Sequence, residues 1–426
     1  MCFIHADSLL SRRAFIQQAS VSAATTAAII GINSEVARAA EGLTVPGMGD
    51  PDRVIAAPAL QGTQTIDGFS MVLHNRWNRD LAPVATVRAG QAVQFLCRDA
   101  LDIGDTARTL TPDGVLKLDL GKVHPLTGPV AIEGAEPGDI LEVEIVDVAP
   151  LVDFGYVVIS PALGLFGSLR PDILAPLNQF TEASQISDPS AGPVPSAIPP
   201  DQPFNSGAPF VQLFTFDKGQ KTGFATFVGA DTGKRARIPL APFMGTYGVA
   251  PLRRGMYRTV PPNVSGGIGG NTDIKQFVAG SRIQYPVYVE GAKFSMGDGH
   301  MAQGDGEVCV TAIETLMAVT CTFRVIKNTI IESPRAIVPA ADPMALGLTR
   351  EMLAKGYFHT TGAGPDLMEN TKRAVRDMMD WLVQEHGLSL HEAYAICSVA
   401  GDLKISEVVD IPNWIVSMTV PRGIFE

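Results

Sequence analysis

The residues best suited to chemistry lie in a glycine-rich stretch that runs from Gly297 to Glu307. Within it, Asp298 and His300 are two residues apart, and this spacing puts both side chains on one face of an extended strand. A carboxylate and an imidazole are common ligands of zinc and related divalent ions. Asp273, in an upstream glycine-rich loop, is the candidate third ligand. Because a catalytic metal lowers the pKa of its bound water to about 7, Glu307 could accept a proton from that water.

The same stretch has a purely conformational explanation. Gly-Asp-Gly sequences form turns because glycine adopts backbone conformations that other residues avoid. A turn and a metal site are therefore equal alternatives for residues 297–307. His124, which precedes Pro125, fits a hydrogen-bonded structural histidine somewhat better than a metal ligand.

Many short strands must position these side chains. Gly and Pro number 42 and 31, and only 18% of the residues are charged, which favours strands joined by turns over long helices. Apolar residues alternate with Glu142 and Glu144 over residues 141–145, which predicts a strand with one face in water. Residues 319–325 alternate in the same way, and a last strand is expected to end at Pro421.

Clear helical signals appear only in the last quarter of the chain. Apolar residues recur at helical spacing from Asp366 to Gln384, and Gly387 follows as a stop signal. Ser389 and Glu392, three residues apart, predict a capping box at the start of a second helix. The fold class is therefore predicted to be mainly β, with an α+β C-terminal part.

Composition divides the chain into three parts. Residues 1–39 are predicted to be a signal peptide, residues 40–345 one or more mainly β domains that carry the site, and residues 346–426 an α+β segment. Prolines concentrate in residues 185–209. That composition predicts an extended loop and not a linker between domains, because strand-like sequence resumes directly after it.

The N-terminal segment has the features of an export signal. Arg12 and Arg13 form a twin-arginine pattern, and an uncharged stretch rich in small residues follows through Ile32. Ala37-Arg38-Ala39 offers a signal-peptidase site before Ala40. A membrane anchor or a chance arginine pair is the alternative, but a spanning helix needs about 20 predominantly apolar residues, and this stretch is too weakly apolar. We therefore expect export to the periplasm by the twin-arginine machinery.

Charge and cysteine content narrow the partners. A formal charge of −11 argues against nucleic acid or an anionic membrane as a partner. Cys97, Cys309, Cys321 and Cys397 show no CxxC spacing for zinc or redox chemistry. Small buried apolar residues are the favoured interpretation of these cysteines, and a disulfide is the alternative that the periplasm allows. A homodimer is left open as the oligomeric state.

The motifs of this sequence resemble those of the acetamidase/formamidase family. They follow the family's order over nearly the whole mature chain, and the string Gly-Asp-x-His-x-x-Gln-Gly-Asp-Gly-Glu of residues 297–307 is long enough to be specific. The other matching segments are residues 74–77 (His-Asn-Arg-Trp), the run from His124 to Asp139, residues 242–245 (Pro-Phe-Met-Gly), 269–273 (Gly-Gly-Asn-Thr-Asp), 286–287 (Pro-Val), 392–394 (Glu-Ala-Tyr) and 398–403 (Ser-Val-Ala-Gly-Asp-Leu).

The resemblance implies hydrolysis of a small carboxamide, such as formamide or acetamide, to a carboxylic acid and ammonia. It also implies a mostly β architecture with sandwich and barrel elements and an α+β part. Family members resemble metal-dependent hydrolases. The expected cofactor is therefore a divalent metal, with zinc as the first candidate.

The residues agree with a mechanism that forms no covalent intermediate. The sequence has no serine-rich glycine segment with a partner lysine, and no cysteine in an obvious nucleophile setting beside a base. Amide carbonyls are poor electrophiles, so the reaction then needs a Lewis acid and an activated water. With the metal held as described above, Glu307 or Glu133 would carry the proton, and His74 would hydrogen-bond the tetrahedral oxyanion.

Two other functions stay open. One is hydrolysis of a lactam or of another small amide by the same site. The other is a periplasmic binding protein that kept the fold and lost the activity. A bound divalent ion with an open coordination position would favour the enzymes, because a binding protein has no need of an activated water.

Overall fold

The structure is a computed structural model, and it describes residues 53–56, 73–161, 163–166, 208–260, 267–338, 349–407 and 414–426. The predicted signal peptide (1–39), the predicted boundary near residue 345 and residues 185–207 of the proline-rich stretch lie outside these ranges. Within them, no helix is both long enough and apolar enough to cross a membrane.

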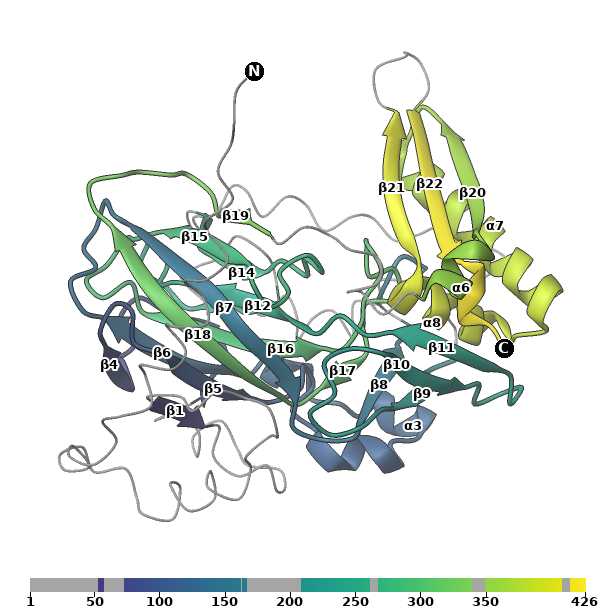
Figure 1. Cartoon of the computed structure of the whole chain (residues 1–426), viewed down its shortest axis with the longest axis horizontal. Helices are drawn as coiled ribbons and strands as arrows, with labels where there is room; N and C mark the ends of the chain where they lie inside the picture. The colour runs from purple at the N-terminus through teal and green to yellow at the C-terminus, as the bar shows by residue number, and fades with distance from the viewer. Residues whose placement is uncertain are drawn as a thin grey trace, which may run out of the picture.

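Two large β-sheets make up most of the molecule (Figure 1). The six-stranded sheet has the order β1 (Arg53–Ala56), β5 (Val93–Cys97), β18 (Met317–Ile326), β7 (Ile140–Pro150), β15 (Arg282–Pro286) and β19 (Arg335–Ile337). The main path of the eleven-stranded sheet has the order β11 (Arg235–Pro239), β10 (Phe224–Val228), β9 (Phe210–Thr215), β8 (Phe154–Ile159), β17 (Glu314–Thr315), β16 (Phe294–His300), β12 (Phe243–Gly248) and β14 (Gly269–Asn271). Three further strands branch from this path. β16 also pairs with β6 (Leu126–Ile132), and β6 pairs with β2 (Leu73–His74) and β4 (Ala85–Val87). A separate pair joins β13 (Tyr257–Arg258) to β3 (Arg76–Trp77).

The two large sheets contact each other through aromatic side chains. The ring centroid of Phe294 on β16 lies 6.0 Å from that of Phe95 on β5 and 5.5 Å from that of Phe323 on β18. All three rings are buried in one continuous apolar core, and such edge-to-face pairs add to the free energy of burial. The described strands form no closed barrel, so the barrel element implied by the family resemblance is not found among them.

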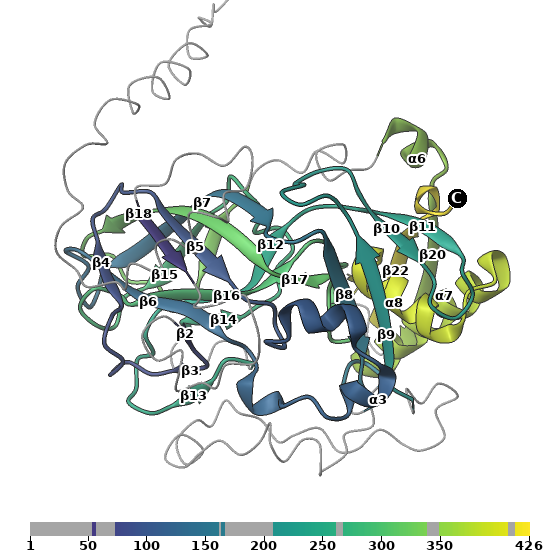
Figure 2. The same cartoon turned by 90° about the horizontal axis from the view of Figure 1, so that it is seen from below.

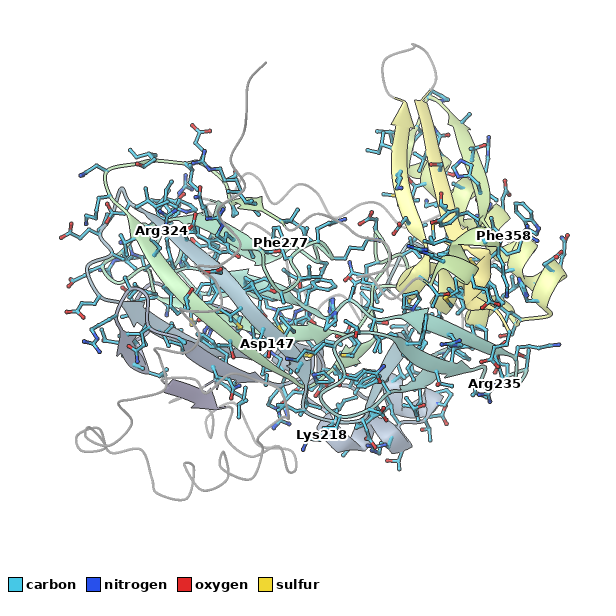
Figure 3. The ribbon with its side chains drawn as sticks, viewed as in Figure 1. Asp147, Lys218, Arg235, Phe277, Arg324 and Phe358 are labelled. Carbon is cyan, nitrogen blue, oxygen red and sulfur yellow. The ribbon has the colours of Figure 1, made fainter. Side chains whose placement is uncertain are left out.

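The predicted strands at residues 141–145 and 319–325 are confirmed as parts of β7 and β18. The prediction that Glu142 faces water is wrong, because its side chain is only 4% exposed. Glu142 lies on a central strand, and long side chains from both neighbouring strands cover it. Its Oε1 lies 2.8 Å from Nη2 of Arg324 on β18, and its Oε2 accepts a hydrogen bond of 2.6 Å from Gln284 on β15. Figure 3 labels Arg324 on this sheet.

The C-terminal part is α+β, as predicted. A three-stranded antiparallel sheet, in the order β20 (Tyr357–Gly364), β22 (Trp414–Pro421) and β21 (Asp402–Glu407), stands at one end of the molecule beside α7 (Leu367–His386) (Figure 1). The helices α6 (Arg350–Ala354) and α8 (Leu390–Ala400) and the short helix η4 (Arg422–Ile424) complete it. Phe358 of β20, labelled in Figure 3, packs with its ring centroid 4.8 Å from that of Trp381 on α7.

Both predicted helices begin where their capping residues indicated, and the first also ends at its predicted stop. The Asp366 side chain accepts hydrogen bonds from the first turn of α7, and Gly387 ends the helix with φ 64°. Only glycine adopts that left-handed conformation without strain. Ser389 and Glu392 form the predicted capping box at the start of α8.

A compact segment of short helices precedes β6. It comprises η2 (Gly104–Thr109), α3 (Pro112–Val115) and η3 (Leu120–Lys122). Figure 2 shows α3 beside β9 of the larger sheet. Ala107 and Val115 of this segment are buried against Phe154, Tyr156 and Val158 of β8.

Candidate active site

Neighbouring strands of the larger sheet bring the candidate ligands together. β16 lies between β12 and β17 and carries Asp298 and His300 at its C-terminal end. Glu314, the first residue of β17, is directly opposite His300 in the strand register. Asp273 comes two residues after β14, which pairs with the other side of β12. Four side chains from three separate segments therefore meet at one end of these neighbouring strands.

His300 is the centre of this cluster. Its Nδ1 lies 2.8 Å from Oε1 of Gln303, so the Nδ1–H group donates to that amide oxygen. The second ring nitrogen, Nε2, faces two carboxylates, with Oδ1 of Asp298 at 3.1 Å and Oε2 of Glu314 at 3.4 Å. Burial would lower the pKa of His300, but Glu314 and Asp298 raise it well above its usual value. Two acceptors this close need a proton or a cation between them. Metal-ligating histidines are commonly oriented in this way through the second ring nitrogen.

Two overlapping sets of side chains have the separation that a metal ion requires. They are Asp273, His300 and Glu307, and Asp298, His300 and Glu314, and the ligand atoms within each set lie within 4.8 Å of one another. Within the described part of the chain, the buried oxygens Asp273 Oδ1 and Glu314 Oε2 make no hydrogen bond. A buried acceptor without a partner is costly, and a cation would satisfy both oxygens. The residues present therefore fit a divalent metal.

Gly245 on β12 leaves the space in which three of these side chains converge. A Cβ atom at this position would approach Asp273 Oδ1, Asp298 Oδ2 and His300 Cε1 to less than 3.0 Å, closer than real Cβ contacts allow. The three residues predicted as ligands thus surround one point on a strand that has no side chain there.

The charges of the cluster are unequal. Burial raises the pKa of Asp273 to about 7, and the neighbouring Asp298 adds to the shift. Burial, followed by Asp273, also raises the pKa of Glu307 well above its ordinary value. Burial alone would raise the pKa of Asp298 too, but His124 and His300 hold it well below its usual range. Burial therefore disfavours the ionised forms of Asp273 and Glu307, whereas the two histidines favour the ionised form of Asp298.

His124, favoured above as a structural histidine, belongs to this cluster. Its Nδ1 lies 3.2 Å from Asp298 Oδ2 and 3.2 Å from the Thr246 hydroxyl. Its backbone N–H donates to Oγ1 of Thr259, whose hydroxyl donates in return to the His124 carbonyl. The ring is therefore held firmly against the second oxygen of Asp298.

Three of the acidic residues have unusual backbone conformations. The φ angles are 48° at Asp273, 67° at Asp298 and 40° at Glu307. Left-handed backbone at residues other than glycine costs about 1–3 kcal/mol and concentrates at functional sites. The premise of a fully extended Asp298 is therefore wrong, although its side chain meets that of His300 as predicted.

Helix α8 holds the loop that carries Glu307. The Ser398 hydroxyl accepts a hydrogen bond of 3.2 Å from the backbone N–H of Cys309 and donates one of 2.9 Å to the Thr311 carbonyl. The Tyr394 hydroxyl donates to the carbonyl of Val308. The C-terminal part thus positions the loop between β16 and β17.

A cavity of about 290 Å³ opens beside the cluster. Its polar side chains come mainly from the residues already described. These are His124, Asn271, Asp273, Asp298, Glu307 and Glu314. Most of the remaining wall is apolar. The ligand candidates, a proton-carrying carboxyl and a space for a small molecule therefore coincide.

Neither His74 nor Glu133 reaches this cavity. Both ring nitrogens of His74 have other partners, with Nε2 at 2.8 Å from the Ser295 hydroxyl and Nδ1 at 3.0 Å from the Arg76 carbonyl. Glu133 is exposed in the turn after β6, whereas His124 lies just before the same strand. A strand of seven residues is about 20 Å long. The proposed roles of His74 and Glu133 therefore have no support in the geometry.

Sequence reasoning missed Glu314 and Gln303. Glu314 lies in the otherwise uncharged run 308–323, and a single acid in a buried apolar strand is the signal that could have identified it. Gln303 falls inside the recognised 297–307 motif, but only the fold shows that its amide joins His300 to the backbone carbonyl of Asp273, at 2.8 and 2.7 Å.

The four cysteines that the structure describes are buried and have free thiols, as favoured above. Cys309 is the one closest in sequence to Glu307. Burial raises the pKa of its thiol to about 11. A thiol in this environment is a poor nucleophile near neutral pH.

Comparison with known proteins identifies the family of this chain. The model of the Acetamidase/Formamidase family matches residues 61–426. An acetamidase of Mycolicibacterium smegmatis is 32% identical over 255 residues, which are 55% of this chain and 61% of that protein. A formamidase of Methylophilus methylotrophus is 29% identical over 83% of this chain and 89% of its own length. The solved structure of a gamma lactamase from Delftia acidovorans superposes with a TM-score of 0.68 over 88% of this chain and 93% of that chain, at 22% identity, and so shares the fold.

A β-rich fold with carboxylates and a histidine gathered in a cavity, together with relatives named for amide substrates, defines an amidase-type hydrolase. Because the family model covers most of its length, this chain belongs to the Acetamidase/Formamidase family.

Proposed function

We propose that this protein hydrolyses the carbon–nitrogen bond of a small carboxamide with the help of a bound divalent cation. The observation that carries the proposal is the convergence of Asp273, Asp298 and His300 on Gly245, beside a cavity whose lining includes both aspartates and Glu307. Family membership and the names of the relatives support a carboxamide as the substrate.

Asp273, Asp298 and His300 would hold the cation, and Glu314 lies within reach as a further ligand. When bound, the cation would polarise the amide carbonyl and lower the pKa of a water molecule. Zinc is the first candidate, because carboxylate and imidazole ligands suit it. Gln303 keeps the Nε2 atom of His300 available as a ligand, because it accepts the proton of Nδ1.

Glu307 is the proposed proton carrier. The oxygen of water forms a new bond to the carbonyl carbon, and Glu307 accepts the proton that the water releases. It then gives this proton to the amide nitrogen as the carbon–nitrogen bond breaks, so that a carboxylic acid and ammonia leave. A carboxyl group whose pKa is raised by burial suits this exchange. His124 replaces His74 as the candidate donor to the carbonyl oxygen, because it lines the cavity beside Asp298.

Metal analysis and ammonia release from the mature chain test this proposal together. We expect stoichiometric metal in the unmodified protein and none in His300→Ala. Glu307→Gln should retain metal and release ammonia roughly 10²–10⁴-fold more slowly, which is the usual contribution of a general acid–base group. Glu133→Gln is the matched control, since this exposed glutamate lies outside the cavity, and it should behave as the unmodified protein.

Three outcomes would contradict parts of the proposal. Full metal content in His300→Ala would exclude His300 as a ligand. Loss of metal from Glu307→Gln would make Glu307 a ligand instead of the proton carrier. A protein that binds metal and carboxamides but releases no ammonia would be a binding protein that kept the fold.

Export to the periplasm is part of the same proposal. Arg12 and Arg13, followed by the Ala37-Arg38-Ala39 cleavage site, support it. Replacement of both arginines by lysine should leave the precursor in the cytoplasm, as fractionation and immunoblotting would measure. Normal export of that variant would exclude the twin-arginine route.

A further inference from the structure

Most of the cavity lining outside the candidate metal ligands is apolar, although Asp119, Ser160 and Thr311 also contribute to it. This apolar wall is formed by aliphatic side chains from the segment between β5 and β6, from the end of β8 and from the loop before β17. The main ones are Leu101, Val115, Leu118, Val123, Val158 and Val310. The proposed mechanism uses none of these side chains, so the wall needs its own explanation.

Hydrogen bonds and packing hold this wall in a fixed position. The buried carboxylate of Asp99 accepts hydrogen bonds from the backbone N–H groups of Ile103 and Gly104, at 3.1 and 2.8 Å, and from the Tyr156 hydroxyl at 2.6 Å. These bonds anchor the start of the segment to β8. Val115 is buried against the same strand, with Leu118 packed at the margin of the cluster. The segment therefore presents its apolar side chains to the cavity from a fixed position.

Val310 is a second, independent sign of function in this wall. Its φ angle is 79°, and a β-branched residue in that region is a genuine outlier. The backbone N–H of Val310 donates to the carbonyl of Glu307 at 2.8 Å, which holds the turn. The strained turn directs an aliphatic side chain to the cavity only three residues after the proposed proton carrier.

The volume of the cavity decides between small and large substrates. An apolar cavity of about 150 Å³ holds benzene, and this cavity measures about 290 Å³. Formamide and acetamide are smaller than benzene, so either would leave most of the apolar wall in contact with water. Because apolar surface gains free energy when a ligand covers it, a larger acyl group would bind better.

We propose that the preferred substrate is a carboxamide with a bulky apolar acyl group, branched or cyclic, that packs against the wall formed by the segment between β5 and β6. This inference rests on the proposed amidase function and specifies its substrate class. The amide group lies at the carboxylate cluster, and the hydrocarbon part occupies the space beside Leu118 and Val158.

The test measures kcat/KM of the metal-loaded enzyme for acetamide, propionamide, isobutyramide and cyclohexanecarboxamide. Each kcat/KM value is divided by the rate of alkaline hydrolysis of the same amide, which removes differences in intrinsic reactivity. We expect an increase of roughly fourfold for each added methylene, which is the transfer free energy of that group expressed as a ratio. Leu118→Trp and Leu101→Phe, which narrow the cavity from two sides, should lower the ratio of cyclohexanecarboxamide to acetamide turnover by at least about tenfold. Val146→Phe, at an exposed position of β7 outside the cavity, is the control and should keep the ratio of the unmodified enzyme.

Two results would overturn the inference, and they differ from failure of the amidase proposal. Highest kcat/KM for acetamide, falling as the acyl group grows, would exclude a bulky substrate while the amidase function stands. If no amide is hydrolysed, calorimetry with the same four amides decides. Cyclohexanecarboxamide that binds no more tightly than acetamide then overturns the inference, and tighter binding that Leu118→Trp weakens supports it.

Discussion

The hydrogen bonds of two histidines distinguish a candidate ligand from a structural residue. His300 donates Nδ1–H to Gln303 and leaves Nε2 facing carboxylates. His74 instead has neutral partners at both nitrogens, the Arg76 carbonyl and the Ser295 hydroxyl. Sequence motifs contain both histidines equally, so only the partners of the second nitrogen separate their roles.

The environment of His74 predicts a pH dependence of stability. Burial lowers its pKa to about 4, although its hydrogen bond to the Arg76 carbonyl acts in the opposite direction. In the unfolded chain the pKa is about 6.5, so on acidification the unfolded state takes up this proton first. The contribution of His74 to the free energy of unfolding is therefore intact above pH 6.5 and falls as the pH drops to 4, by about 3 kcal/mol in total.

Urea unfolding between pH 4 and pH 7 measures this effect. His74→Gln should lose less stability across that range than the unmodified protein, and His359→Gln, at an exposed position of β20, is the control. Parallel curves for the His74 variant and the unmodified protein would show that His74 takes up its proton without penalty in the folded state.

At the scale of elements, the strand pairing of β12, β14, β16 and β17 creates the site. No pair of ligands other than Asp298 and His300 comes from one strand. Gly245 makes the close approach feasible, because a side chain on β12 would occupy the space where the ligands converge.

Gly245→Ala should therefore lower the affinity for the metal, and this effect should exceed its effect on the free energy of unfolding. The added Cβ would displace Asp273, Asp298 or His300, and we expect at least about tenfold lower metal affinity, the minimum usually seen when a ligand's support is altered. Competition with a chromophoric chelator measures it. Gly134→Ala is the control. A Cβ at Gly134 would contact nothing within 4 Å, although its φ of 78° means that alanine strains the backbone there. This variant therefore carries a cost in stability without a clash with the candidate ligands. Equal metal affinity in both variants would contradict the role of Gly245.

At the scale of the whole molecule, the C-terminal part and the site loop form one hydrogen-bonded unit. Ser398 and Tyr394 of α8 bind the backbone of residues 308–311. Lys275, two residues after Asp273, forms an ion pair with Asp402 at the start of β21. Two loops of the candidate site, the one after β14 and the one between β16 and β17, are thus attached to the C-terminal part.

Ser398→Ala tests this coupling. The substitution leaves the Cys309 N–H without its partner, which should lower the free energy of unfolding by about 1–3 kcal/mol. Because the same loop carries Glu307, we also expect kcat to fall by about 10- to 100-fold, as small displacements of catalytic groups do. Thr371→Ala, at a partly exposed position of α7, is the control and should leave kcat unchanged. A loss of stability without a change in kcat would restrict α8 to a structural role.

The amino-acid sequence determined the features that depend on neighbouring residues. Caps at Asp366 and Ser389 and the stop at Gly387 were predictable because helix termini are satisfied by residues within a turn of them. Alternation of apolar and polar residues identified β7 and β18, because successive side chains of a strand point to opposite faces. The proximity of Asp298 and His300 also followed from their spacing alone.

Tertiary structure decided what depends on strands that are distant in the sequence. Glu314 and His124 join the site because β17 and the start of β6 both lie beside β16, and no local pattern specifies that pairing. Glu133 is excluded because it lies at the opposite end of β6 from His124. The size and apolar wall of the cavity arise where the segment between β5 and β6 packs against β8. Spacing along the chain therefore predicted that individual candidate ligands lie together, whereas the complete cluster and the cavity beside it depend on long-range packing.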